Sequence, residues 1–312
     1  MTRSVTTPDD WAARALAASK WLMVQQSAFD PSLAAGMEAM GKVIAAVAVG
    51  MGSVELEEPG DLPVSAMPTS ALAWSMFGLA RAAPGTATPK LAAELHRRVD
   101  GATGGVWATA DRGDHLLLVD AAVVGLAALE AGDESLARSM ARFCRTFAWD
   151  QPLDEAAVLI ARTPDGKLMM GGPRVRAHAP DQPVSALFAA SAFLAGWFEE
   201  IGDDEDLAAS IELHDLGVAL GDEVWSSVAG AMAGLAGASL FRVTGEEPFR
   251  STADRMADAL CEMQSADGSW GSNGAAPPAE VTAEVAVVLA DMADLVRERA
   301  AIDALLGSDA DP

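Results

Sequence analysis

The stretch CEMQSADGSWGS, residues 261–272, breaks an alanine-rich, helix-favouring chain with a Gln, an Asp-Gly turn and a Trp. A similar order of polar exit, Gly-rich turn, Trp, polar loop and apolar helix occurs in residues 99–129, VDGATGGVWATADRGDHLLLVDAAVVGLAAL. A third copy begins with PDGKLMMGG at 164–172 and lacks the Trp. A helix–loop–helix unit that recurs about every 50 residues is typical of a repeat architecture whose units bury each other's faces.

Apolar periodicity between caps and breakers predicts helices from end to end, with no run of strands. The helices are of two kinds. Segments such as 115–132, 183–198 and 281–292 are apolar nearly all round, whereas 134–147 carries a charged face. The predicted helices cover residues 9–28, 32–51, 65–82, 88–99, 114–131, 133–148, 152–162, 182–200, 205–220, 223–244, 248–264 and 279–300.

Alternation of all-buried and half-buried helices predicts two concentric rings. Long Gly-rich loops lead from the outer kind of helix into the inner kind, and short loops return, which supports this arrangement. We therefore expect an all-α fold, an (α/α)6 barrel, in which residues 1–312 form a single domain with a short tail at about 306–312.

Composition excludes several classes of function. The chain has 312 residues, 51% of them hydrophobic, and a formal net charge of −24, so nucleic acid is not an expected partner. Cys144 and Cys261 have no metal-ligand or disulfide spacing, which fits a reducing compartment. No signal peptide is evident, and the apolar runs 42–54 and 183–198 are shorter than the ~20 residues of a membrane span. The expected location is the cytoplasm, and the oligomeric state stays open.

The run Gln264-Ser-Ala-Asp-Gly268-Ser-Trp270-Gly resembles the Q-x-x-x-G-x-W repeat of the squalene–hopene cyclase and protein prenyltransferase superfamily. The following PPAEVTAEVAVVL, residues 277–289, resembles the inner-helix start found after that repeat. The resemblance implies an (α/α)6 toroid in which Gln264 caps an outer helix and Trp270 stacks on the neighbouring turn. It also implies a class II terpene cyclase, which starts its reaction by protonating a prenyl chain. The zinc site of the prenyltransferases has no counterpart here.

Three carboxylates are candidates for this chemistry. By the resemblance, Asp120 matches the middle acid of the cyclases' Asp-x-Asp-Asp and is the expected general acid, although its flanking acids are missing. Burial in an apolar helix should raise its pKa. Glu284 is a second lone acid in an apolar helix, and Asp114, beside His115, is a supporting acid. The alternatives are a buried structural Asp, a helix-start acid and an N-cap.

Two further groups are candidates for binding. Trp21, Trp74, Phe77, Phe188 and Trp197 are predicted on inner helices, where their rings could stabilise a carbocation or simply fill the core.

On the loop 171–183, Arg174, Arg176 and His178 could bind a diphosphate, or the loop could be merely solvated. We expect no resident metal or cofactor, with Mg²⁺ entering only if the substrate is a diphosphate. The run GDDED at 202–206 lacks the acid spacing that ionises prenyl diphosphates with magnesium.

The leading hypothesis is thus an enzyme that cyclises a hydrophobic prenyl or polyprenyl chain. Two alternatives stay open. A carbohydrate-active (α/α)6 enzyme would need a polar, acid-rich cleft with two acids that flank a sugar bond. A non-catalytic prenyl-binding protein would tolerate the incomplete acidic motif.

Overall fold

The computed structural model describes residues 6–24, 64–82, 88–151, 157–177, 183–271 and 279–308. Within these ranges the chain is almost entirely helical. Two 3₁₀ helices, η1 (Asp222–Ser226) and η2 (Val228–Gly230), precede one of the α-helices. The α-helices are α1 (Pro8–Val24), α3 (Thr69–Ala82), α4 (Thr88–Arg98), α5 (Leu118–Ala131), α6 (Glu134–Trp149), α7 (Ser185–Ile201), α8 (Asp204–Val218), α9 (Ala231–Thr244), α10 (Glu247–Met263) and α11 (Ala279–Ser308).

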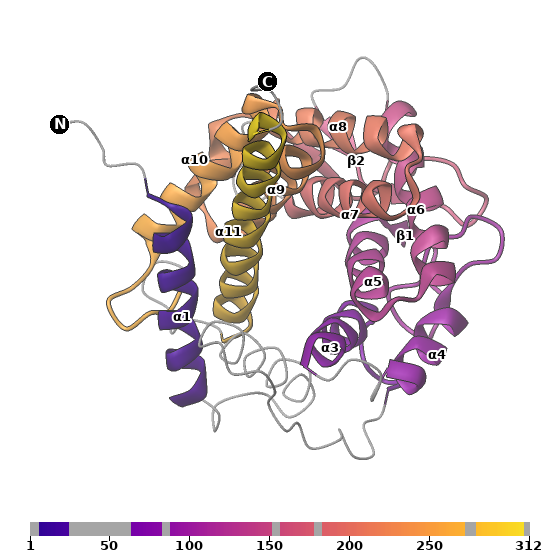
Figure 1. Ribbon diagram of the computed structural model, residues 1–312. Helices are drawn as coiled ribbons and strands as arrows, with labels where there is room; N and C mark the ends of the chain where they lie inside the picture. The colour runs from indigo at the N-terminus through magenta and orange to yellow at the C-terminus, as the bar shows by residue number, and fades with distance from the viewer. Residues whose placement is uncertain are drawn as a thin grey trace.

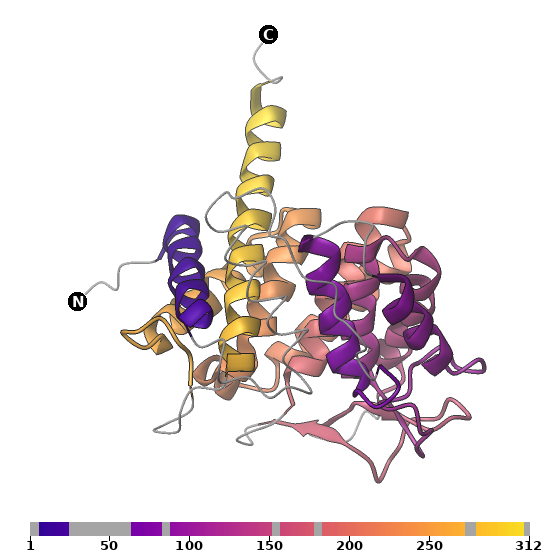
Figure 2. The same cartoon turned by 90° about the horizontal axis from the view of Figure 1, so that it is seen from below.

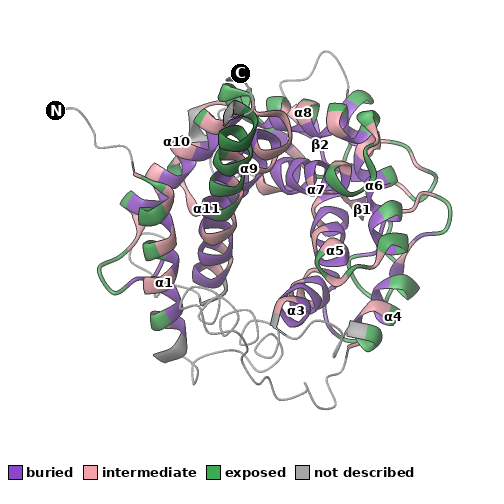
Figure 3. Ribbon diagram, in the orientation of Figure 1, coloured by how far each residue is buried: buried purple, intermediate pink, exposed green. Residues whose placement is uncertain are grey.

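The helices form two concentric layers, as the sequence predicts (Figure 1). In the inner layer α3, α5, α7, α9 and α11 follow one another, each packed against the next. In the outer layer α4, α6, α8, α10 and α1 each pack mainly on one inner helix, respectively α3, α5, α7, α9 and α11. Figure 3 shows the consequence for burial, because the inner helices are buried over most of their surface while the outer helices expose one side. The all-α toroid is therefore confirmed.

Close contact between inner helices depends on small residues. In α5 most side chains are buried, and Gly125 lies directly under the ring of Phe193 from α7. A Cβ atom on Gly125 would lie 2.5 Å from that ring, so only a glycine lets the two helices approach this closely. The outer helix α6 instead buries one face and begins at Asp133, whose side chain accepts a hydrogen bond from the Leu136 N–H.

The inner helices α5, α7 and α9 are each connected to the following outer helix by a two-residue turn of the same type. Each inner helix ends at a glycine in the left-handed conformation, with φ of 68°, 76° or 74°, and an acidic residue that follows directly is the N-cap of the outer helix. The turns are residues 132–133, 202–203 and 245–246. Because α6, α8 and α10 run back in this way, α5, α7 and α9 share one direction, and the described connections that lead to the next inner helix lie at the opposite rim.

The stretch quoted first forms one of these longer connections. Gln264 is the C-cap of α10, and its side-chain amide donates to the Arg14 carbonyl of α1 at 3.0 Å. Trp270 is fully buried, and its Nε1 donates to the Leu260 carbonyl of α10 at 2.8 Å. The hydroxyl of Thr282, in α11, donates to the Trp270 carbonyl at 3.1 Å. The expected joint between an outer helix and the next inner one is confirmed.

The described residues include four short strands, which contradicts the prediction that the chain has none. β1 (Leu116–Leu117) pairs antiparallel with β3 (Ala161–Arg162), and β2 (Ala157–Leu159) pairs antiparallel with β4 (Arg174–Arg176). The predicted helix over 152–162 is therefore wrong for its described part. Its apolar residues fit a strand as well as a helix, and pairing with distant segments decides between them. Figure 2 shows the strands at the rim opposite the projecting end of α11.

Several helix ends also differ from the prediction. β1 occupies the start of the predicted helix 114–131, and 3₁₀ turns precede α9. α11 continues to Ser308, into the expected tail. No helix in the described part of the chain is both long and apolar enough to cross a membrane. The predicted helix 32–51 lies outside the described residues.

Candidate functional site

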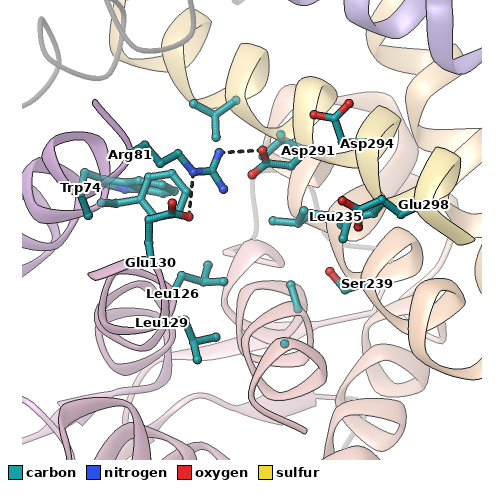
Figure 4. A pocket seen from close by; sticks show the side chains of 17 residues that line it. Trp74, Arg81, Leu126, Leu129, Glu130, Leu235, Ser239, Asp291, Asp294 and Glu298 are labelled. Carbon is teal, nitrogen blue, oxygen red and sulfur yellow. Dashed lines mark hydrogen bonds and ion pairs between the residues drawn. The ribbon is translucent and has the colours of Figure 1, made fainter. Parts of the chain in front are cut away.

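A central pocket of about 530 Å³ lies between the inner helices (Figure 4). All five described inner helices contribute to its walls. Its apolar lining includes Leu126 and Leu129 of α5, Leu235 of α9 and Leu295 of α11. Its aromatic and polar lining is Trp74, Phe77, Arg81, Glu130, Ser239, Asp291, Asp294 and Glu298.

Arg81 lies at the centre of the charged part of this pocket. Its Nε is 2.8 Å from Glu130 Oε2, and its Nη1 is 2.6 Å from Asp291 Oδ1. Burial opposes the charge of the guanidinium, but the two carboxylates outweigh it and raise the pKa of Arg81. The arginine thus joins α3, α5 and α11 through half-buried ion pairs, which Figure 4 shows as dashed lines.

Trp74 and Phe77 form an aromatic wall on α3. Their rings meet edge to face, with centroids 5.6 Å apart and planes at 81°. The guanidinium carbon of Arg81 lies 4.2 Å from the centre of the Phe77 ring. The face of Phe77 is therefore already occupied by a cation, and the partly exposed Trp74 is the aromatic surface left for a ligand.

Asp120 lies in the first turn of α5, nearer to the rim of long connections than the pocket is. It is 7% exposed, and its Oδ2 has no hydrogen-bond partner among the described residues. Burial raises the pKa of Asp120 to about 6, although the nearby charge of His115 opposes this rise. The sequence-based expectation of a raised pKa agrees with this environment.

Glu284 lies on α11 and is half-buried. It precedes the pocket-lining residues Val287 and Val288 by three and four positions, so it projects from the same face of the helix, about 5 Å further along the axis. Burial raises the pKa of Glu284. α11 and α5 lie on opposite sides of the ring in Figure 1, so Glu284 and Asp120 belong to helices that face each other.

Asp114 is not part of this arrangement. It is on the connection before β1, and its side chain is 79% exposed. Its Oδ1 is 2.5 Å from His115 Nδ1, and this hydrogen bond lowers the pKa of Asp114.

The cationic loop also lies outside the pocket. Arg174 and Arg176 belong to β4, whose backbone pairs with β2 at the rim of long connections. Arg174 is half-buried and Arg176 is exposed. His178 lies outside the described residues, so the expected diphosphate-binding trio cannot be assembled from the described part of the chain.

Of the five aromatic residues expected around the hollow, three are elsewhere. Trp21 is on the outer helix α1. Phe188 points outward to α8, where its ring meets His214 at 6.1 Å, and Trp197 packs under Arg138 of α6 at 5.5 Å. An inner helix is apolar both toward the ring axis and toward the outer layer, so periodicity alone does not tell which way a ring points.

Comparison with known proteins supports the architecture. No protein-family model matches the chain, and the comparison with curated proteins gives no match. Solved structures do match it over nearly its whole length. The chain is an (α/α)6 toroid.

These structures include an unsaturated glucuronyl hydrolase from Streptococcus agalactiae, with a TM-score of 0.63 and 11% identity over 94% of each chain. An unsaturated glucuronyl hydrolase specific for heparin has a TM-score of 0.61 and 12% identity, covering 93% of this chain and 98% of that one. A D-mannose isomerase has a TM-score of 0.59 and 11% identity, covering 91% of this chain and 86% of that one.

The similar structures are carbohydrate-active toroids, so the expected membership of the terpene cyclase superfamily and the expected cyclase function are wrong. In this chain the residues from Gln264 to Trp270 form a structural joint between helices, through hydrogen bonds to the Arg14 and Leu260 carbonyls. The lining of the pocket gives a physical reason against a prenyl substrate. The pocket is not uniformly apolar, because Arg81 and four carboxylates line it.

Sequence reasoning missed Arg81, Glu130, Asp291, Asp294 and Glu298. One signal was available in α11, where acids recur every seven residues, at 284, 291 and 298. Seven residues are about two helical turns, so these acids lie along one face of an otherwise apolar helix. A stripe of this kind on an inner helix indicates an acidic wall.

Proposed function

We propose that this chain is a carbohydrate-active enzyme that cleaves a glycosidic bond with carboxyl groups inside the ring. The observation that carries the proposal is the pair Asp120 and Glu284, two acids with raised pKa values on the inner helices α5 and α11, which lie on opposite sides of the ring. Other residues of the same two helices line the central pocket. Glycosidases require an acid and a base on opposite sides of the scissile bond. The fold shared with glucuronyl hydrolases and a mannose isomerase supports the same class of substrate.

The walls of the pocket suit a sugar. A sugar ring presents C–H groups that pack on aromatic surfaces and hydroxyl groups that need polar partners. Trp74 offers the former, and Ser239 and Asp291 offer the latter from the neighbouring helices α9 and α11. A prenyl chain would leave these polar groups desolvated and without new partners, which is costly.

The environments of the two acids suggest their roles. Burial raises the pKa of Glu284, which favours the protonated form and suits Glu284 to the role of general acid. The pKa of Asp120 is about 6 with His115 nearby, so near neutrality Asp120 is mostly ionised and can act as the base. Hydrolysis fits two acids that face each other better than isomerisation does, since isomerisation needs a proton moved between neighbouring carbons of one sugar.

The test is a hydrolysis screen of the purified chain with aryl glycosides and short oligosaccharides, followed by variants on the best substrate. Glu284→Gln should lower kcat by about 10²-fold or more, and Asp120→Asn by a similar factor. Glu212→Gln, the same change at an exposed site on the outer helix α8, is the matched control and should leave kcat unchanged. Wild-type turnover in both the Glu284 and the Asp120 variants, or isomerisation of free aldoses without any hydrolysis, contradicts the proposal.

A further inference from the structure

The central pocket has an excess of negative charge. Its walls carry four carboxylates, those of Glu130, Asp291, Asp294 and Glu298, and one guanidinium, that of Arg81, which gives a formal charge of −3. The pocket of a protein that binds an acidic sugar would be expected to have the opposite balance, because a ligand carboxylate needs cationic partners.

Arg242, which contacts the pocket residue Glu298, is already shared between two carboxylates. Arg242 of α9 contacts Glu298 through its Nε at 2.7 Å, and its Nη1 contacts Glu199 of α7. Arg81 in the same way lies between two carboxylates, and its flat face rests on Phe77. Both guanidinium groups are therefore already engaged by two carboxylates each, which leaves them less able to clamp the carboxylate of a ligand.

A third arginine, Arg297 of α11, is also paired with two carboxylates. Arg297 contacts Asp294 at 3.1 Å and Asp9 of α1 at 2.6 Å. When these outer partners are included, six carboxylates surround three arginines, so the excess of three negative charges remains. The ion pairs organise the wall without neutralising it.

Helix direction adds to the negative potential. Arg81 and Glu130 are in the last turns of α3 and α5, so the carboxyl-terminal ends of both helices face the pocket. A helix ends with the equivalent of about half a negative charge on its unpaired carbonyls. This contribution comes from the backbone and is independent of the acidic side chains.

Resting on the site proposed above, we infer that the pocket takes a sugar that bears a positively charged amine, and that it rejects uronic acids. An ammonium group gains contacts with Asp291 or Glu298 without breaking a pair, since these carboxylates outnumber the arginines. A uronate would have to displace a carboxylate from Arg81 or Arg242 inside a negative field. This selectivity is opposite to that of the glucuronyl hydrolases with which the chain shares its fold.

The test compares three monosaccharides of one stereochemistry and different charge: glucosamine, glucose and glucuronate. Binding to the full chain is measured by calorimetry or ligand-observed NMR slightly below neutral pH, at low and at high salt. Glucosamine should bind about tenfold more tightly than glucuronate at low salt, with glucose between them and a narrower spread at high salt. Equal affinities, or tightest binding of glucuronate, overturn the inference.

Variants assign the effect to the pocket. Glu298→Gln should reduce the glucosamine-to-glucuronate ratio about threefold, whereas Glu212→Gln on the outer surface should leave it unchanged. An equal response of the two variants would mean that net charge, and not the pocket, sets the order. The experiment measures binding alone, so charge selectivity without hydrolysis would refute only the proposed function. Hydrolysis with a preference for uronates would refute only this inference.

Discussion

Replacing Asp120 by Asn should stabilise the folded ring near neutral pH while it removes the proposed base. Asp120 is almost fully buried, and its Oδ2 lacks a hydrogen-bond partner among the described residues. Ionising this carboxyl group is therefore less favourable in the folded chain than in the unfolded one. Asn has nearly the same shape and no charge, so the variant escapes this cost.

The magnitude follows from the pKa of Asp120. Its rise from an ordinary 3.8 to about 6 corresponds to about 3 kcal/mol, at roughly 1.4 kcal/mol for each pKa unit. Because the folded state holds the proton more tightly, the ionisation cost is absent well below pH 3.8, grows up to about pH 6 and is constant above it. The Asn amide has its own desolvation cost, but that cost does not depend on pH.

The assay is urea unfolding of both proteins at about pH 4 and about pH 8. Asp120→Asn should gain about 2 to 3 kcal/mol relative to the parent on going from the lower to the higher pH. Asp204→Asn, at an exposed position of α8, is the control and should show little change. A difference between variant and parent that is the same at both pH values would refute the claim that Asp120 is buried without compensation.

Three further substitutions test the joints of the fold. Arg98→Met should lower the free energy of unfolding by about 3 to 5 kcal/mol, as thermal melting would measure. Arg98 and Glu94 are each 2% exposed, so the change leaves the Glu94 carboxylate buried, with the exposed Arg97 as its remaining ion-pair partner among the described residues. Gly268→Ala should lower Tm, because φ is 96° and a Cβ would lie 2.7 Å from a backbone oxygen of α1, whereas Gly101→Ala, with no atom within 4 Å, should not. Trp270→Phe should cost about 1 kcal/mol in urea unfolding, since it removes the 2.8 Å hydrogen bond to the Leu260 carbonyl of α10 and leaves that carbonyl with the Gln264 N–H at 3.1 Å. An unchanged midpoint would show that the tryptophan hydrogen bond contributes nothing.

The two-layer ring could be predicted because the distribution of apolar residues around each helix indicates how many of its sides are buried. A helix such as α5, with neighbours on all sides, must be apolar nearly all round, and its partner α6 must not be. The glycine-acid turns mark the helix ends equally well. The strands could not be predicted in this way, since β2 and β4 exist only through their pairing with each other across a long connection.

The pocket could not be predicted from the sequence, because its charged residues come from segments that are far apart along the chain. Arg81 and Glu130 are polar residues near helix ends, where the sequence gives them an ordinary solvated role. Only the closing of the ring brings them to Asp291, which is more than 150 residues away along the chain. The sequence indicates Asp120 and Glu284 because a lone acid in an apolar helix is conspicuous, but the chemistry that they could serve depends on the pocket further along the same helices.

The two-residue turns after α5, α7 and α9 limit how far the pocket can change shape when a ligand binds. Glu130 lies near the rim at which α5 turns back, and the two-residue turns after α5, α7 and α9 give the ends of these three helices little slack. The parts of the pocket wall that these helices form should therefore move less on binding than a loop-built site does. Binding should be of the lock-and-key kind, with little ordering entropy to overcome, and new specificities should arise there by exchanging side chains and not by lengthening loops.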